Sequence, residues 1–94
     1  MPTLRQLKAL ALIGQTGSFT RAAEKLFITQ SAVSSLIREL EEEIGMPLVQ
    51  RGRVISLTEA GEHLQRAGNR ADLEIERAVK EVMDLSPRGI RQHL

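Results

Sequence analysis

The sequence predicts a mainly α-helical domain with one short β-hairpin, followed by a long helix, and three observations support this fold class. First, apolar residues recur at helical spacing through the first 44 residues, and Ser, Thr or Gly stands where each stretch begins or ends. Second, LVQRGRVISL at residues 48–57 combines β-branched residues with a central glycine, which is typical of a hairpin. Third, residues 59–86 contain no proline and keep one apolar seam, as a single helix would.

Length and composition indicate one small globular domain. Of the 94 residues, 41% are hydrophobic and 27% are charged, a mixture that argues against disorder. Cysteine is absent, which excludes disulfides and thiolate metal sites and fits a reducing cytoplasm. There is no apolar run of membrane-spanning length and no signal-peptide pattern. We therefore expect a cytoplasmic protein with no membrane partner.

Charge and aromatic content bear on the choice of a nucleic-acid partner. The net charge is only +1, so basicity by itself is weak evidence for nucleic acid. Phe19 and Phe27 are the two aromatic residues of the chain. Without Trp or Tyr the domain lacks the stacking platforms that binders of single strands and RNA commonly use. Duplex DNA is therefore the more natural nucleic-acid partner.

The first helix is expected to begin after Thr3, which can cap its N-terminus, and to stop at Gly14 and Gly17. Its apolar residues recur on one face and are Leu4, Leu7, Leu10, Ala11 and Ile13. This helix is interpreted as the scaffold of the core.

Residues 18–40 hold two further helical patterns separated by a tight connection. Ser18 can cap the first pattern and Thr29 the second. The first pattern places three apolar residues on one face, Ala22, Ala23 and Leu26. Only Phe27 and Ile28 remain to form the turn, where many such motifs carry glycine. The spacing predicts a helix-turn-helix, and the alternative is an ordinary pair of packed helices in a small bundle.

The second helix of this motif has an unusual outward face. Its buried stripe is expected to contain Val33, Leu36, Ile37, Leu40 and Ile44. Its outward side carries short hydroxyls, one amide and one guanidinium, groups that can approach and read base edges in a major groove. The DNA-binding residues predicted in this recognition helix, residues 29–44, are Thr29, Gln30, Ser31, Ser34, Ser35 and Arg38. Four acids stand near its C-terminal end, at Glu39, Glu41, Glu42 and Glu43. They oppose the helix dipole and would repel phosphate, so we expect an approach to DNA with the N-terminus first. We expect these acids to form a plain solvated end, and the alternative is a contact with a protein partner.

The hairpin at residues 48–57 is interpreted as a wing. Pro47 prevents the preceding helix from continuing, and Arg51, Gly52 and Arg53 are expected to form a compact turn. Two arginines at the tip of a hairpin suit the DNA backbone or the minor groove. The alternative is an exposed loop that happens to be basic.

The last helix is expected to begin after Thr58 and to run to Ser86, a length of about 40 Å. Its apolar and small residues are spaced as a heptad seam, at Leu64, Gly68, Ala71, Ile75, Ala78, Val82 and Leu85. The first turns around Leu64 can pack on their own domain, whereas the later turns need another partner. We therefore predict a dimer interface made of Leu64, Ala71, Ile75, Ala78, Val82 and Leu85.

With these motifs described, residues 3–88 resemble the N-terminal DNA-binding region of LysR-type transcriptional regulators. The matching motifs are SFTRAAEKLFITQSAVSSLIRELEEEIG at 18–45, PLVQR at 47–51 and LTEAG at 57–61. The resemblance implies a winged helix-turn-helix with a linker helix that pairs antiparallel across a dimer. It also implies DNA contacts in the recognition helix and wing, at Gln30, Ser31, Ser34, Ser35, Arg51 and Arg53. Two departures are Ser31, where the family often has proline, and a segment 51–58 that is one residue shorter than the usual wing.

The full prediction is a winged helix-turn-helix at residues 1–58, a linker or dimerisation helix at 59–86, and a hinge stub or tail at 87–94. Its function would be that of a sequence-specific regulator that binds double-stranded DNA at an imperfect palindrome as a homodimer or higher homo-oligomer. Members of the family normally continue into an effector-binding domain, so we expect this chain to be a fragment or a short form that binds no small-molecule effector and no cofactor.

Two rival classes of function were weighed against DNA binding. A winged helix can also serve as a protein-interaction or dimerisation module that does not bind DNA, and retardation of random duplex DNA at low salt would distinguish the two. An enzyme is disfavoured because His63 and His93 are isolated and no motif places an acid and a base beside a nucleophile.

Overall fold

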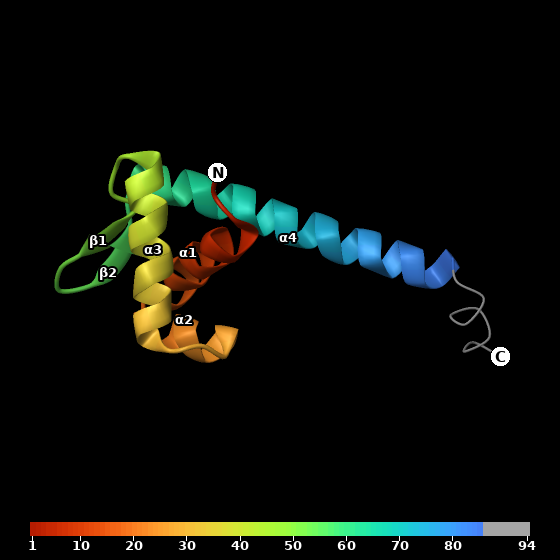
Figure 1. The fold of residues 1–94 in the computed structure, drawn as a ribbon, viewed down its shortest axis with the longest axis horizontal. Helices are drawn as coiled ribbons and strands as arrows, with labels where there is room; N and C mark the ends of the chain where they lie inside the picture. Colours follow the sequence, from red (N-terminus) through yellow and green to blue (C-terminus); the bar gives the residue numbers. More distant parts are fainter. Residues whose placement is uncertain (86–94) are drawn as a thin grey trace.

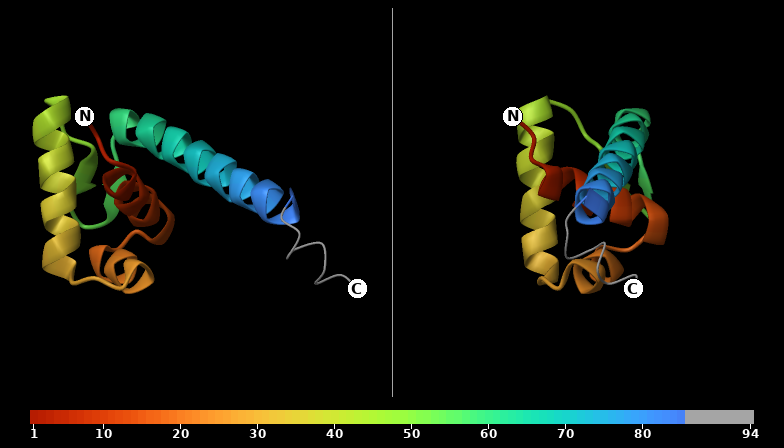
Figure 2. Two further views of the ribbon diagram at one scale, coloured as in Figure 1. Left: turned by 45° about the vertical axis from the view of Figure 1, so that its right-hand side comes forward. Right: turned by 90° about the vertical axis from the view of Figure 1, so that its right-hand side faces the viewer.

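The computed structural model describes residues 1–85 as a small helical head from which one long helix extends (Figures 1 and 2). The elements follow in the order α1 (Leu4–Thr16), α2 (Phe19–Leu26), α3 (Gln30–Ile44), β1 (Val49–Arg51), β2 (Ile55–Leu57) and α4 (Glu59–Leu85). The predicted fold class, three helices and a two-stranded wing followed by a long helix, is confirmed. Ser86 and the predicted tail at 87–94 lie outside the described residues.

Each predicted helix start is confirmed by a capping hydrogen bond. The side-chain oxygens of Thr3, Ser18, Thr29 and Thr58 each accept a hydrogen bond from the backbone N–H three residues later, at 3.0–3.1 Å. These bonds satisfy amides that have no partner within their own helix.

The first helix ends later than predicted. Gly14 lies inside α1, and Gly17 ends the helix with φ 68° and an N–H that donates to the carbonyl of Ile13 at 2.8 Å. A Cβ at Gly14 would overlap the side chain of Gln65 and lie 2.7 Å from Leu57, so this glycine allows α4 and β2 to approach α1 closely. Leu4, predicted on the apolar face, is 43% exposed.

The turn of the helix-turn-helix is made by Phe27 in place of glycine. Phe27 has φ 58° and ψ 41°, and its N–H donates to carbonyls of the last turn of α2. The left-handed conformation costs a residue with a Cβ about 1 kcal/mol or more. The ring is 94% exposed, so it contributes little packing in return.

The core lies between α1, α2, α3 and the segment before β1. Its fully buried large side chains are Leu10, Ile13, Val33, Ile37, Leu40 and Leu48. The seam of α2 consists of small residues and one ring, Phe19, Ala22 and Ala23. Small residues let α2 pack close to both neighbouring helices, which fixes the angle at which α3 is presented.

The wing is a short antiparallel hairpin that pairs Val49 with Leu57 and Arg51 with Ile55. Val54, one of the β-branched residues on which the hairpin was predicted, lies in the loop instead of a strand and is 72% exposed. The base of the hairpin is joined to the start of α4, because Thr58 donates from its N–H to the carbonyl of Leu48 at 3.0 Å.

The long helix α4 packs on α1 through its first turns and then leaves the head (Figure 1). Leu64 packs against the core and Gly68 is buried beside α1, which confirms that the first turns pack on their own domain. None of the helices within residues 1–85 combines the length and apolar character that a membrane span requires.

Candidate nucleic-acid interface

The outward face of α3 brings the predicted recognition residues together. Five of the six line one shallow surface hollow of about 450 Å³, namely Gln30, Ser31, Ser34, Ser35 and Arg38. The sixth, Thr29, is the N-cap at the start of the same helix. Because the serine side chains are short, the α3 backbone can come close to a flat or grooved partner. We call these six residues the recognition face.

Two side-chain hydrogen bonds organise the recognition face. Arg38 donates from Nη2 to the Ser35 hydroxyl at 3.4 Å. Thr20 of α2 donates from its hydroxyl to Oε1 of Gln30 at 3.3 Å. Sequence reasoning missed Thr20, because helical periodicity does not reveal which residue of one helix meets the first residue of the next.

The two ends of α3 differ in charge. The N-terminal end carries the positive end of the helix dipole, and exposed Arg21 and Lys25 belong to the neighbouring helix α2. The C-terminal end carries the exposed acids Glu39, Glu42 and Glu43. This polarity fits an anionic partner that is approached by the N-terminus of α3.

The prediction of four plainly solvated acids at that end is wrong for Glu41. Its Oε2 accepts hydrogen bonds from the backbone N–H of Leu48 at 2.8 Å and of Val49 at 3.2 Å. Both of these residues are buried. Glu41 therefore ties the end of α3 to the first residues of the wing.

The wing arginines occupy different positions. Arg51 was expected in the turn, but it is the last residue of β1, and its guanidinium carbon lies 4.7 Å from the centroid of the Phe19 ring. This cation–π contact joins the wing to α2. Arg53 lies in the loop at the tip and is exposed. Across the hairpin, Ser56 donates to Oε1 of Gln50 at 3.2 Å, a polar pair that sequence reasoning did not identify.

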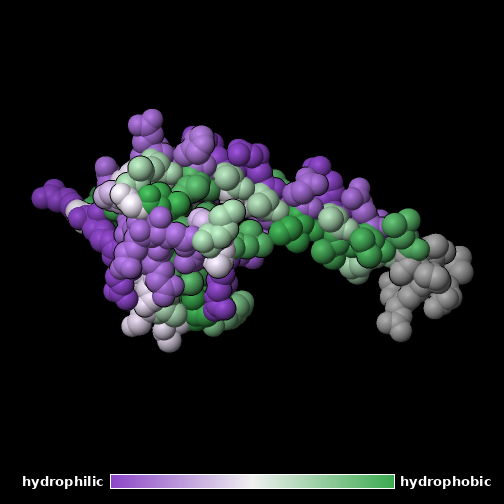
Figure 3. All heavy atoms as spheres, turned by 45° about the horizontal axis from the view of Figure 1, so that its top comes forward, coloured by the Kyte–Doolittle hydropathy of each residue, from purple (hydrophilic) through white to green (hydrophobic). Residues whose placement is uncertain are grey.

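The second half of α4 carries an exposed apolar stripe. Figure 3 shows hydrophobic residues along one side of this helix and hydrophilic residues along the other. Of the predicted interface residues, Ile75 is 45% exposed, Val82 65% and Leu85 78%. Val79 and Met83, which are also exposed, widen the stripe toward the C-terminal end of the helix. Ala71 is half-buried and Ala78 is exposed, whereas Leu64 packs against the core of its own chain.

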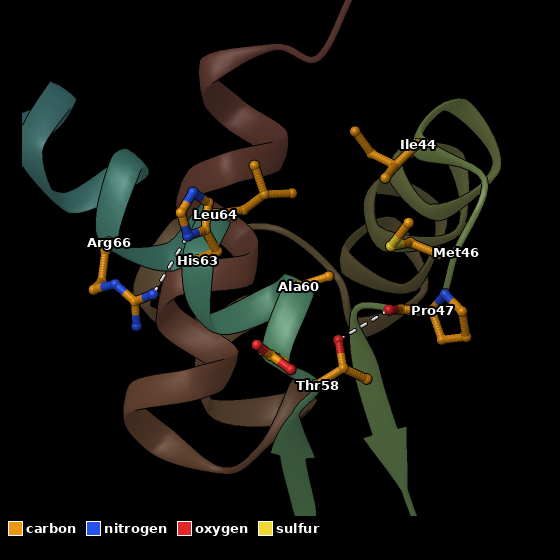
Figure 4. Close-up of a pocket in the computed structure, with 9 residues that line it drawn as sticks. Ile44, Met46, Pro47, Thr58, Ala60, His63, Leu64 and Arg66 are labelled. Atoms are coloured by element: carbon orange, nitrogen blue, oxygen red, sulfur yellow. Dashed lines mark hydrogen bonds between the residues drawn. The ribbon is translucent and has the colours of Figure 1, made fainter.

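An apolar groove of about 680 Å³ lies where the C-terminal end of α3 meets the start of α4 (Figure 4). Its apolar walls are formed by Ile44, Met46, Pro47, Ala60 and Leu64. His63 stands at the groove with Nδ1 3.4 Å from Nη2 of Arg66. Within residues 1–85, no group of three or more His, Asp or Glu side chains is arranged to hold a metal ion. His93 lies outside the described residues.

The fold and the recognition face define a winged helix-turn-helix protein with a long C-terminal helix. Residues 4–62 match the family described as bacterial regulatory helix-turn-helix protein, lysR family. The chain belongs to this LysR family, as the sequence motifs predicted.

Similar proteins include the HTH-type transcriptional activator CmpR of Synechocystis sp., which is 52% identical over 61 residues, and the RuBisCO operon transcriptional regulator of Allochromatium vinosum, which is 39% identical over 93 residues. These alignments cover 64% and 95% of this chain, but 20% and 31% of the two relatives. The chain thus spans between a fifth and a third of the length of these relatives.

Two solved structures have the same fold as this chain. The DNA-binding domain of BenM in a complex with catB site 1 DNA has a TM-score of 0.84 and 30% identity, with 90% of this chain and 96% of that chain covered. ArgP from Mycobacterium tuberculosis has a TM-score of 0.79 and 40% identity, with 85% of this chain and 31% of that chain covered.

Proposed function

We propose that this chain is the DNA-binding part of a transcriptional regulator and binds double-stranded DNA sequence-specifically as a homodimer or higher homo-oligomer. The observation that carries the proposal is the recognition face, which gathers Gln30, Arg38 and three serines on the outward side of α3. The similarity to the DNA-bound BenM domain supports it. The proposal places the protein in the cytoplasm and includes no enzymatic activity, no cofactor and no effector bound by these 94 residues.

The chemistry of the recognition face suits a major groove. The groove is wide enough to admit an α-helix, and its base edges present distinct patterns of donors and acceptors. Gln30, in the first turn of α3, offers an amide to a base, and Arg38 offers a forked set of donors. Thr29 and the serines supply hydroxyls for bases or phosphates. The exposed acids at the other end of α3 keep that end away from the phosphate backbone.

The wing is proposed to contact the DNA beside the recognition helix. Arg53, exposed at the tip, is the side chain best placed for a phosphate or the minor groove. Arg51 also belongs to this proposed contact surface, although its guanidinium is held over Phe19. A cation held in this way loses less side-chain freedom when it meets a phosphate.

Dimerisation is proposed to occur through α4. Several apolar side chains of its second half are exposed, and each is worth on the order of 1–3 kcal/mol when buried. An antiparallel pair centred between Ala71 and Ala78 would bring Leu85 of a second copy opposite Leu64, beside the apolar groove. In this organisation residues 1–58 bind DNA and residues 59–86 hold two copies together on a two-fold axis. The operator would then be an imperfect palindrome with half-sites about one helical turn, or a multiple of it, apart.

Sites selected from a random duplex pool allow the function to be tested. The parent chain is expected to enrich a palindromic sequence, and Gln30→Ala should cost about 1–3 kcal/mol on that sequence and little on random DNA. Gln15→Ala, at an exposed position of α1, is the matched control and should leave both affinities unchanged. A chain that retards no duplex DNA at low salt would instead be an interaction module. Equal losses for Gln30→Ala on selected and random DNA would show that Gln30 does not read a base.

A further inference from the structure

Thr20 lies on α2, outside the recognition face, yet it is hydrogen-bonded to the first residue of α3. Its hydroxyl donates to Oε1 of Gln30 at 3.3 Å, across ten residues of sequence. Both side chains are exposed, so the bond is not part of the core. The two residues lie in the first turns of their helices: Thr20 is the second residue of α2, and Gln30 is the first residue of α3.

We propose that Thr20 is a positioning residue that fixes the orientation of the Gln30 amide and thereby selects the base that Gln30 reads. This inference rests on the proposed DNA-binding function. A threonine hydroxyl can either donate to an amide oxygen or accept from an amide NH₂ group. Here it donates to Oε1, and in that role it leaves the NH₂ group on the other side of the Gln30 amide facing the partner. The amide therefore presents two N–H donors in place of an interchangeable donor and acceptor.

A donor is matched by base edges that carry acceptors. In the major groove these are N7 and O6 of guanine, N7 of adenine and O4 of thymine, whereas cytosine presents only its N4 amino group as a donor. An NH₂ group facing the cytosine amino group would leave donors unpaired in a desolvated contact, which is costly. The base contacted by Gln30 should therefore be an acceptor-bearing base, with cytosine disfavoured.

The two side chains differ in freedom, which explains why threonine suits this role. A β-branched threonine in a helix has few χ1 rotamers, so its hydroxyl oxygen has few possible positions. Glutamine has three side-chain torsions and a terminal amide whose two orientations are otherwise similar in energy. A rigid donor beside a flexible amide reduces the ordering that binding requires.

The test uses Thr20→Val, which keeps the shape and removes the hydroxyl, and Thr20→Ser, which keeps the hydroxyl. The position that Gln30 reads is first located as the one at which Gln30→Ala loses its base preference. Binding is then measured by mobility shift on four duplexes that differ only in the base at that position. The parent and Thr20→Ser should disfavour cytosine at that position by about tenfold or more. Thr20→Val should reduce that discrimination at least severalfold, with unchanged affinity for random DNA and an unchanged melting temperature.

A double variant separates positioning from direct contact. If Thr20 acts through the amide, Thr20→Val should have no further effect on any of the four duplexes in the Gln30→Ala background. A uniform loss of affinity on all four duplexes, or an effect of Thr20→Val that persists without Gln30, would assign Thr20 to a phosphate contact and overturn the inference. Unchanged discrimination in Thr20→Val would also overturn it, and so would a parent chain that prefers cytosine, because the amide oxygen would then face the base. Failure of the parent chain to bind any duplex would be a failure of the proposed function instead.

Discussion

Glu41 is expected to be the acid on α3 that stabilises the fold, and the size of its effect can be worked from its contacts. Its carboxylate accepts from two backbone N–H groups of buried residues, at 2.8 and 3.2 Å. A hydrogen bond to a charged group contributes about 1.5–3 kcal/mol, and the partial exposure of Glu41 favours the lower end of that range. Glu41→Ala leaves both amides without their acceptor, so its cost should be about 2–4 kcal/mol.

Thermal unfolding followed by circular dichroism measures this cost. For a domain of this size, 1 kcal/mol corresponds to a shift of about 4–8 °C, so Glu41→Ala should lower Tm by roughly 10–30 °C. Glu41→Gln keeps a neutral acceptor and should fall between Glu41→Ala and the parent. All variants must be compared at one protein concentration, because association of a folded dimer raises the apparent stability.

The neighbouring acid Glu42 provides the matched control. It lies on the same helix, carries the same charge and is exposed. Removing a carboxylate near the C-terminus of a helix relieves an unfavourable interaction with the helix dipole, so Glu42→Ala should be neutral or slightly stabilising. If Glu41→Ala and Glu42→Ala melt within about 3 °C of each other, the bonds from Glu41 to the wing do not stabilise the domain.

Three further predictions concern packing, assembly and DNA binding. Gly61→Ala should destabilise the domain by about 1–3 kcal/mol in urea unfolding, because the added Cβ would overlap the backbone carbonyl of Leu48. The Cβ of Gly68→Ala would make only ordinary contacts, so this variant should be neutral or up to about 1 kcal/mol stabilising. Val82→Asp would place a charge in the dimer seam and should give monomers in sedimentation at tens of micromolar. Lys80→Asp, outside the seam, should leave the dimer intact, and a parent chain that is itself monomeric would contradict the proposed dimer. Arg53→Ala should weaken binding to selected and to random DNA by a similar factor. It should also reduce by about one the slope of log affinity against log salt concentration, so an unchanged slope would exclude a phosphate contact.

Much of the fold could be predicted because its signals are local. Thr3, Ser18 and Thr29 each bond a backbone amide three residues away, so helix starts are visible in short stretches of sequence. The stripe of α3 is a period within one helix, and it identified the buried Val33, Ile37 and Leu40 and the side of the helix that faces outward. The motifs of residues 18–61 also identified the family, because they place the same kinds of residue at the same spacing as in its members.

Tertiary structure decided which of several equivalent residues has a particular role. Gly14 and Gly17 look alike in sequence, but Gly14 faces Gln65 and only Gly17 takes a positive φ. Likewise one of four acids on α3 ties down the wing, and one of two wing arginines stacks on Phe19. These roles depend on contacts between segments that are distant in the sequence. Composition and helical period are the same whichever residue makes the contact, so only the packing of the helices against one another could distinguish them.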